Sequence, residues 1–216
     1  MIRRSREVAE GMSKGVQFLF KKNKITIING FGKLKAPGVV EVSGSDGEST
    51  LVKAPHIILA TGARSKELPN LKQDGKKIIG YRTAMTLEKQ PQSMVVVGSG
   101  AIGSEFAYFY NSMGTRVTLV EFMPEVVPNE DEEVSKALAR SFKKAGMSVL
   151  LNSSVEKVDT SGDNCVVTIK TPKGHETLET EVVLSAVGIS PNTEGIGLEE
   201  TGVRLENGKV AVDAYY

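Results

Sequence analysis

The stretch Met94–Glu105, with the sequence MVVVGSGAIGSE, decides the fold that we expect for this chain. Its first four residues, Met94–Val97, are apolar and mostly β-branched, which predicts a buried strand. The strand leads directly into a G-x-G-x-x-G pattern, formed by Gly98, Gly100 and Gly103. Glycines at this spacing between a strand and a helix are typical of a dinucleotide-binding turn.

The residues after the glycine pattern supply the other parts of the same unit. Phe106–Met113 has the apolar spacing of a helix, and Gly114 can end that helix. A second apolar strand, Arg116–Val120, leads to the acid Glu121, which lies 18 positions after Gly103. This is close to the distance of about 20 that is typical of a ribose-binding acid. An acid at this distance is expected to accept hydrogen bonds from ribose hydroxyls.

Each glycine has its own predicted role. Gly98 permits the tight turn, Gly100 lets a pyrophosphate approach the backbone, and Gly103 lets the helix pack closely on the strand. The helix N-terminus offers unpaired N–H groups and a partial positive charge to the phosphates. The alternative is a glycine turn in an α/β domain that binds no ligand.

The residues around the acid predict which dinucleotide binds. The segment Glu121–Val127, EFMPEVV, contains no Arg or Lys that could meet a 2′-phosphate. Repulsion between the carboxylate and that phosphate should favour NAD over NADP by about 2–4 kcal/mol, or roughly 30- to 1000-fold.

Composition restricts the class of protein. A chain of 216 residues with 40% hydrophobic and 25% charged residues is typical of one large or two small globular domains. The net charge of +1 gives no global attraction for nucleic acid or a membrane surface. The single cysteine excludes an internal disulfide and suits a reducing compartment. There is no transmembrane run or signal peptide, so we expect a cytoplasmic protein.

The N-terminal residues predict an amphipathic helix. Apolar residues at Val8, Met12, Val16 and Leu19 repeat at helical spacing within Ile2–Lys22. Several Arg and Lys residues make this end of the chain basic. We interpret them as a solvated helix face rather than a nucleic-acid patch, because few aromatic residues lie among them.

Four short strands are expected next, at Lys24–Gly30, Val39–Gly44, Ser49–Ala54 and His56–Ala60. The apolar part of the last, Ile57–Ala60, predicts a buried parallel strand, which needs neighbours and helices on both faces. Residues 1–63 do not obviously supply them. His56 has no His or Cys nearby, so we interpret it as structural rather than catalytic.

The middle of the chain predicts a connector, a helix and a strand. The polar connector covers Arg64–Gln92 and includes a short helix around Thr83–Glu88. The next helix, Asn129–Ala145, has acids in its first turn and lysines in its last, which complements the helix dipole. This arrangement explains the acids better than a metal site would. Met147–Leu151 is the next strand.

A second antiparallel meander is predicted after it, at Val155–Val158, Cys165–Ile169 and Glu176–Leu178. Cys165 shares one face of its strand with two apolar residues, so it is expected in the core rather than as a reactive thiol. Val182–Val187 is another buried strand, and residues 189–216 have loop and short-strand character.

One arrangement occurs twice. A glycine-punctuated meander leads into an apolar strand and a small-residue turn at Ile57–Ala63 and again at Val182–Gly188. Only the second copy has a glycine fingerprint upstream. The chain therefore resembles two related dinucleotide-binding folds, of which the first lacks its beginning.

Five motifs carry a resemblance to a known family: ING-FGKL, APHIILATGA, MVVVGSGAIGSEFA, VTLVE and VLSAVGISPNTEGIGLEETGV. In this order they resemble the flavin disulfide reductases of the pyridine nucleotide-disulfide oxidoreductase family, class I. The lipoamide branch, the dihydrolipoamide dehydrogenases, is the most similar. The resemblance implies a Rossmann-like α/β fold with a parallel sheet and an antiparallel meander. It assigns residues 66–188 to a complete NAD-binding domain, and residues 1–65 and 189–216 to a partial FAD-binding domain.

The resemblance also implies binding residues. In the family, the counterpart of Glu105 lies near the nicotinamide, and that of Ile102 covers the flavin. The implied NAD contacts are Gly98, Ser99, Gly100, Ala101, Ile102, Gly103, Ser104, Glu105, Glu121, Val155 and Gly188. The implied FAD contacts are Phe31, Gly32, Thr61, Gly62 and Ala63.

Other family features do not occur in this sequence: the FAD fingerprint, the C-x-x-x-x-C redox pair, the second FAD motif and the C-terminal domain with its catalytic His. We therefore expect an internal fragment of a dihydrolipoyl dehydrogenase that binds NAD but is inactive by itself. We also expect that the fragment does not form the native dimer and does not retain FAD. The parent enzyme is expected to be a homodimer that meets lipoyl domains of 2-oxoacid dehydrogenase complexes. The alternatives are a reductase for another disulfide, such as glutathione, mercuric or coenzyme A substrates, and a non-catalytic NAD-binding module.

Overall fold

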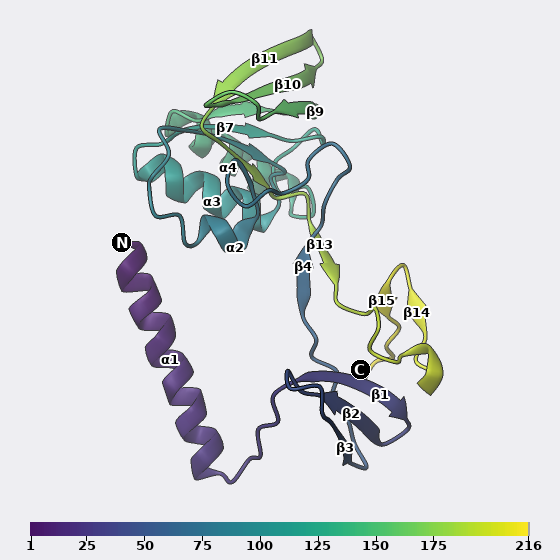
Figure 1. Cartoon of the computed structure of the whole chain (residues 1–216). Coiled ribbons are helices and arrows are strands. Elements are labelled where there is room, and N and C mark those ends of the chain that lie inside the picture. Colours follow the sequence, from purple (N-terminus) through teal and green to yellow (C-terminus); the bar gives the residue numbers. More distant parts are fainter. Residues whose placement is uncertain (216) are drawn as a thin grey trace. The chain divides into compact units, whose positions relative to one another are not determined.

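The computed structural model describes residues 1–215, and the chain divides into two compact units (Figure 1). One unit is built from Arg3–Arg64 together with the segment that begins at Ser190, and the other is built from Ser65–Ile189. The chain passes between the units twice, at β4 (Ala63–Ser65) and β13 (Ile189–Pro191), and these two strands pair with each other.

The second unit contains a five-stranded sheet in which every neighbouring pair is parallel. In spatial order its strands are β5 (Ile78–Ile79), β12 (Val182–Ser185), β6 (Ser93–Val97), β7 (Arg116–Val120) and β8 (Ser148–Leu150). Its helices are α2 (Tyr81–Ala84), α3 (Ala101–Ser112) and α4 (Glu132–Lys144). The run β6–α3–β7–α4–β8 extends the sheet in one direction from β6, while β12 lies on the other side of β6. The carboxyl ends of β6 and β12 therefore form a topological switch point, where doubly wound sheets bind ligands.

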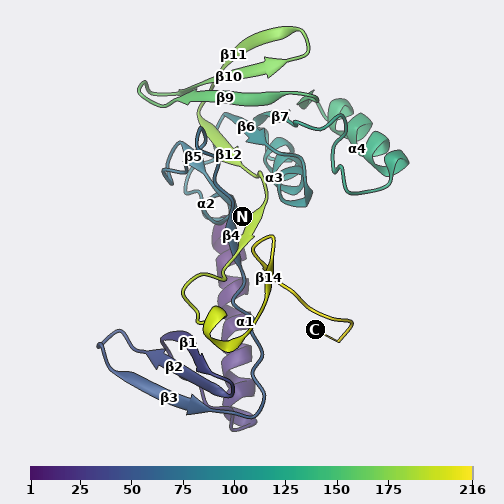
Figure 2. The ribbon, with the colours of Figure 1, turned by 90° about the vertical axis from the view of Figure 1, so that its right-hand side faces the viewer.

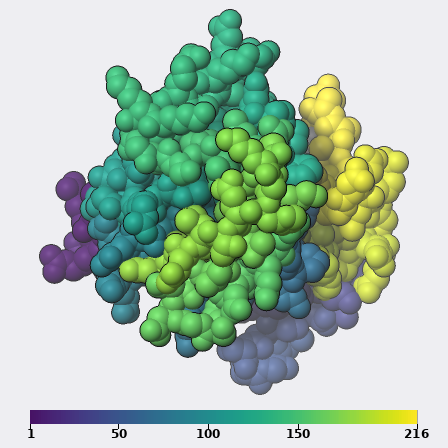
Figure 3. Space-filling model, turned by 90° about the horizontal axis from the view of Figure 1, so that it is seen from above, coloured from purple at the N-terminus to yellow at the C-terminus, as the bar shows by residue number. Residues whose placement is uncertain are grey.

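The sheet is covered on both faces. On the helical face, Val96 and Leu119 pack with Tyr110 and Phe142 from α3 and α4. The other face packs against an antiparallel meander of β9 (Ser154–Asp159), β10 (Cys165–Thr171) and β11 (Gly174–Thr180), as Figure 2 shows. In Figure 3 this meander, in green, lies over the sheet on the side that faces the viewer. Burial on both faces explains why the strands are almost continuously apolar.

The first unit has a long helix, α1 (Ile2–Lys22), and an antiparallel sheet of β1 (Phe31–Ala36), β2 (Val39–Ser43) and β3 (Ser49–Lys53). Its C-terminal segment contributes the 3₁₀ helix η1 (Glu199–Thr201), followed by the hairpin of β14 (Leu205–Glu206) and β15 (Lys209–Val210). The core of this unit is small: Leu34, Ile196 and Leu198 are its buried apolar residues. It is therefore much less packed than the second unit.

Two of the predicted strands are wrong. Lys24–Gly30 and His56–Ala60 have no strand structure, and the Ile58 side chain is 91% exposed. A strand requires a neighbour that pairs with its backbone. Within residues 1–215, no segment pairs with either of these two, so most of their large apolar side chains remain exposed. Ile57 is the exception, since it packs partly against the small core of the first unit. The apolar stripe of α1 is exposed for the same reason, since no residue of this helix is buried.

Other predictions agree in kind and differ at their ends. The short helix expected around Thr83–Glu88 is α2, which ends earlier, at Ala84. The helix expected from Asn129 begins at Glu132, because the Asp131 side chain caps it by accepting the Glu133 N–H at 2.8 Å. The Cys165 side chain is fully buried on β10, and burial raises the pKa of its thiol. The prediction that Cys165 belongs to the core is confirmed.

Candidate functional site

The glycine turn between β6 and α3 has little free space at two of its three glycines. Gly98 has φ +95°, and a Cβ atom there would lie 2.5 Å from the Ala186 carbonyl oxygen. A Cβ atom at Gly103 would lie 1.9 Å from the Gly98 carbonyl oxygen. At Gly100, by contrast, a Cβ atom would meet nothing within 4 Å. Gly98 and Gly103 are thus required by the fold, whereas Gly100 leaves open space in front of the turn.

The N-terminus of α3 lacks the side-chain acceptors that α4 has. Its N-cap residue, Gly100, has no side chain, and its first turn contains no acid. In α4 the Asp131 carboxylate caps the helix, and two further acids follow it. The first N–H groups of α3 therefore have neither an intrahelical nor a side-chain acceptor, which suits an anionic ligand.

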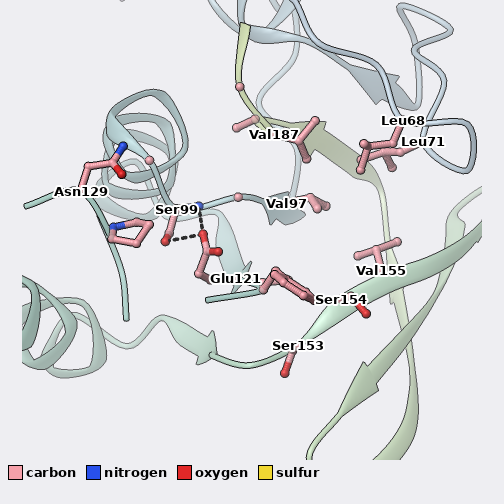
Figure 4. Close-up of a pocket in the computed structure, with 17 residues that line it drawn as sticks. Leu68, Leu71, Val97, Ser99, Glu121, Asn129, Ser153, Ser154, Val155 and Val187 are labelled. Carbon is pink, nitrogen blue, oxygen red and sulfur yellow. Dashed lines mark hydrogen bonds between the residues drawn. The ribbon is translucent and has the colours of Figure 1, made fainter. Parts of the chain in front are cut away.

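Glu121 lies directly after β7 and is held by the same turn. Its side chain is only 7% exposed. Its Oε2 accepts hydrogen bonds from the backbone N–H and from the hydroxyl of Ser99, each at 2.7 Å (Figure 4). Its Oε1 accepts one from the Met123 N–H at 2.8 Å. These donors fix the orientation of the carboxylate beside the glycine turn.

A cavity of about 390 Å³ opens at the carboxyl ends of the parallel strands (Figure 4). One side of it is polar, with Ser99 and Glu121, and the other is apolar, with Leu71 and Val155. Its complete lining is Leu68, Leu71, Val97, Gly98, Ser99, Gly100, Val120, Glu121, Phe122, Pro128, Asn129, Ser153, Ser154, Val155, Ala186, Val187 and Gly188. No Arg or Lys is among these lining residues.

Part of the apolar side of the cavity comes from a short turn, Leu68–Leu71, in the connector that precedes β6. Leu68 and Leu71 form an isolated β-bridge, and Asn70 is one of the two residues between them in the sequence. The Asn70 Nδ2 donates to the Val155 carbonyl at 2.8 Å and to the Glu156 carbonyl at 3.2 Å. These bonds tie the turn to β9, beside the cavity-lining residue Val155.

The predicted NAD residues are only partly gathered at this cavity. Those that line it are Gly98, Ser99, Gly100, Glu121, Val155 and Gly188. Those in the first turns of α3 do not line it: Ala101, Ile102, Gly103, Ser104 and Glu105. Of these, Ser104 supports the turn by donating its hydroxyl to the Ser99 carbonyl at 2.8 Å, and Glu105 is exposed.

Several lining residues were missed from the sequence. Phe122, Ser153 and Val187 each lie just after a parallel strand, so the rule that ligands bind at the carboxyl ends of such strands could have found them. Leu68 and Leu71 come from a polar connector without periodicity, and no local signal marks them.

The predicted FAD residues all lie in the first unit, and Ala63 is also the first residue of β4. Phe31 and Gly32 are on β1, and the Phe31 side chain is 57% exposed. The Thr61 hydroxyl donates to the Asn192 carbonyl at 2.8 Å, and the Asn192 N–H donates to the Gly62 carbonyl at 3.0 Å. A cavity of about 190 Å³ in this unit has other lining residues, among them Lys33 and Leu205.

An exposed ion pair stabilises the same part of the first unit. The Arg64 guanidinium donates to both carboxylate oxygens of Glu194, at 2.7 and 3.0 Å. This contact lowers the pKa of Glu194 to about 2. Because the pair links Arg64 to the C-terminal segment, it holds together two parts of the chain that are far apart in sequence.

Residues 1–215 contain no group of three or more His, Cys, Asp or Glu side chains with the arrangement of a metal site. They also contain no helix that combines the length and the apolar character needed to span a bilayer.

The parallel sheet with its switch point, the glycine turn and the buried acid after β7 define an α/β protein with the architecture of a Rossmann-like fold. A family model described as pyridine nucleotide-disulphide oxidoreductase matches residues 2–216. The chain belongs to this family. The fold class and the resemblance inferred from the sequence are thereby confirmed.

The chain is similar to several characterised proteins. It is 39% identical over 216 residues to dihydrolipoyl dehydrogenase from Zymomonas mobilis, which covers 100% of this chain and 46% of that protein. It is 40% identical over 208 residues to leghemoglobin reductase from Vigna unguiculata, covering 95% of this chain and 40% of that one. The chain therefore spans less than half the length of these curated relatives.

Solved structures agree with this likeness. The structure of LpdA from Mycobacterium tuberculosis matches with a TM-score of 0.86 at 30% identity, covering 96% of this chain and 46% of that one. The flavoprotein disulfide reductase RclA from Escherichia coli matches with a TM-score of 0.84 at 24% identity, covering 98% and 48% of the two chains. At that identity the second match is evidence for the fold alone.

Proposed function

We propose that the second unit binds NAD(H) in the cavity beside Gly98–Gly100, as the NAD-binding part of a dihydrolipoyl dehydrogenase. The whole enzyme would oxidise dihydrolipoamide through a redox disulfide and FAD, and would reduce NAD⁺ to NADH. The observation that carries the proposal is the buried Glu121 carboxylate, which faces a cavity next to the glycine turn.

The residues that would hold the dinucleotide follow from the geometry of the turn. The pyrophosphate would approach the open space at Gly100, where the first N–H groups of α3 lack side-chain acceptors. Glu121 would accept a hydrogen bond from the adenosine ribose. Val155 and Gly188 line the same cavity and would contact the remainder of NAD. By analogy with the family, Ile102 would lie near the flavin and Glu105 near the nicotinamide.

The charge of the cavity favours NAD(H) over NADP(H). Glu121 is the charged residue of the lining, and no Arg or Lys offsets it. A 2′-phosphate would therefore meet a carboxylate without a compensating cation. Discrimination by about 30-fold or more is expected from this repulsion together with the lost ribose hydrogen bond.

The first unit, with the C-terminal segment, would belong to the FAD-binding domain of the whole enzyme. Phe31, Gly32 and Thr61–Ala63 are its proposed FAD contacts. FAD would carry electrons between the disulfide and the nicotinamide, whereas the protein would orient the cofactors and exclude water. The whole enzyme would be a cytoplasmic homodimer that receives lipoyl domains of a 2-oxoacid dehydrogenase complex.

The test is a fluorescence titration with NADH and NADPH on variants of two acids. Glu121→Gln removes the charge with little change in size, and it should weaken NADH binding about tenfold and raise the relative affinity for NADPH. Glu130→Gln is the matched control, because Glu130 is exposed and does not line the cavity. An unchanged NADH/NADPH affinity ratio in Glu121→Gln would contradict the assignment of Glu121.

A further inference from the structure

The Ser99 side chain lies in the glycine turn and contacts the buried acid after β7. Ser99 is completely buried, and it directs both its backbone N–H and its hydroxyl at the same carboxylate oxygen, Oε2 of Glu121. Both distances are 2.7 Å. Within residues 1–215 this hydroxyl is the side-chain donor to Glu121, and the other donors are the backbone N–H groups of Ser99 and Met123.

The contact leaves one oxygen of the Glu121 carboxylate able to accept a further hydrogen bond. An ionised carboxylate has about four acceptor positions, two on each oxygen. Both positions on Oε2 are used by Ser99, and one position on Oε1 is used by the Met123 N–H. The remaining position on Oε1 is therefore the one that a ligand can use without displacing a protein donor.

We propose that Ser99 is a positioning residue for nucleotide specificity: its hydroxyl holds Oε2 of Glu121, so that Oε1 is presented to a hydroxyl of the adenosine ribose. This inference rests on the proposed function and adds a second determinant to it. A carboxylate held by donors on both oxygens cannot rotate away from a 2′-phosphate, so the same hydroxyl also strengthens the exclusion of NADPH.

Replacement of Ser99 by alanine isolates this effect. Alanine removes only the hydroxyl, while the backbone N–H of residue 99 can still donate to Glu121. With one charge-assisted bond lost, NADH binding should weaken about five- to tenfold. NADPH binding should not weaken, because it gains nothing from the fixed carboxylate. The NADH/NADPH affinity ratio should therefore fall by at least the same factor.

The experiment measures both affinities by fluorescence titration for the wild-type chain, Ser99→Ala and Ser99→Gly. Ser93→Ala is the control, because Ser93 is a buried serine at the opposite end of β6 that accepts a hydrogen bond from the Glu181 N–H. Circular dichroism melting confirms that each variant folds, and Ser99→Gly provides a second removal of the hydroxyl if Ser99→Ala is unstable.

The outcomes separate the two claims. A reduced ratio in the Ser99 variants and an unchanged ratio in Ser93→Ala would support the inference. Equal weakening for both nucleotides would mean that Ser99 only stabilises the turn, and an unchanged NADH affinity would mean that its hydroxyl is unimportant; either result overturns the inference alone. A wild-type chain that binds no NADH would overturn the proposed function and this inference together.

Discussion

A Cβ atom added to Gly103 would lie 1.9 Å from the carbonyl oxygen of Gly98. This relationship shows how closely α3 approaches the end of β6. The close approach brings the N-terminus of α3 to the carboxyl end of the sheet, next to the cavity and Glu121. The same contact links the fold of the second unit to its site. It also distinguishes Gly103, which has no room for a side chain, from Gly100, where a Cβ atom would meet nothing within 4 Å.

The first prediction compares these two glycines. Gly103→Ala should destabilise the chain by about 3 kcal/mol, because the new methyl group overlaps backbone atoms that cannot move independently. Gly100→Ala should melt close to the wild type, since its Cβ meets no protein atom within 4 Å. Gly100→Ala should nevertheless weaken NADH binding at least tenfold by filling the space for the pyrophosphate. Thermal melting and NADH titration of both variants check this, and a stable Gly103→Ala would contradict the packing.

The second prediction concerns a buried hydroxyl. Tyr110 on α3 is buried, and its hydroxyl donates to the Ala84 carbonyl at 2.6 Å. Tyr110→Phe should cost about 1–2 kcal/mol of unfolding free energy, because the Ala84 carbonyl would remain buried without its donor. Tyr108→Phe is the matched control on the same helix, since Tyr108 is 59% exposed. Urea unfolding of both variants measures the difference, and equal stability of the two would refute this role.

The third prediction follows from the lowered pKa of Glu194, which is about 2 beside Arg64. A carboxyl whose folded pKa lies below its unfolded value stabilises the fold above the unfolded pKa. That contribution should decrease as the pH falls from about 4.5 toward 2. Glu194→Gln should lack this dependence, and added salt should reduce it, because the pair is exposed. Hydrogen exchange of the Asn192 amide from pH 5 to 2 compares the two proteins, and parallel profiles would contradict the prediction.

The fourth prediction tests the exposed apolar segment of the first unit. Ile58→Ser should change the unfolding free energy by less than about 0.5 kcal/mol and should reduce binding of a hydrophobic dye. Ile169→Ser should cost more than about 3 kcal/mol, because Ile169 is buried on β10. Dye fluorescence and thermal melting distinguish the two positions. A loss of stability in Ile58→Ser similar to that in Ile169→Ser would show that the Ile57–Ala60 segment is packed after all.

Much of the second unit could be predicted because its signals are local. The strand Arg116–Val120 was predicted with its observed ends. Its ends are marked locally, by Gly114 shortly before it and by the acid Glu121 directly after it. The alternation in Cys165–Ile169 identified a strand with one buried face for the same reason. The cavity was only partly predictable, because Leu68 and Leu71 reach it through the Asn70 contacts with β9, which depend on tertiary structure.

The errors in the first unit have one physical cause. Ile57–Ala60 has the composition of a buried parallel strand, but composition states only what a segment needs, not whether a partner is present. Without a pairing segment among residues 1–215, its backbone forms no ladder and Ile58 stays exposed. The helix α1 was predicted with its observed ends, because its helical period is a local signal, whereas burial of its apolar stripe depends on a partner.

The central claim is that the cavity beside Glu121 binds NAD(H) in preference to NADP(H). Isothermal titration calorimetry of the wild-type chain with NADH and then NADPH tests it most directly, because it needs neither FAD nor turnover. We predict saturable binding of one NADH per chain and NADPH binding that is at least about 30-fold weaker. Equal affinities, or no heat of binding for NADH, would contradict the account.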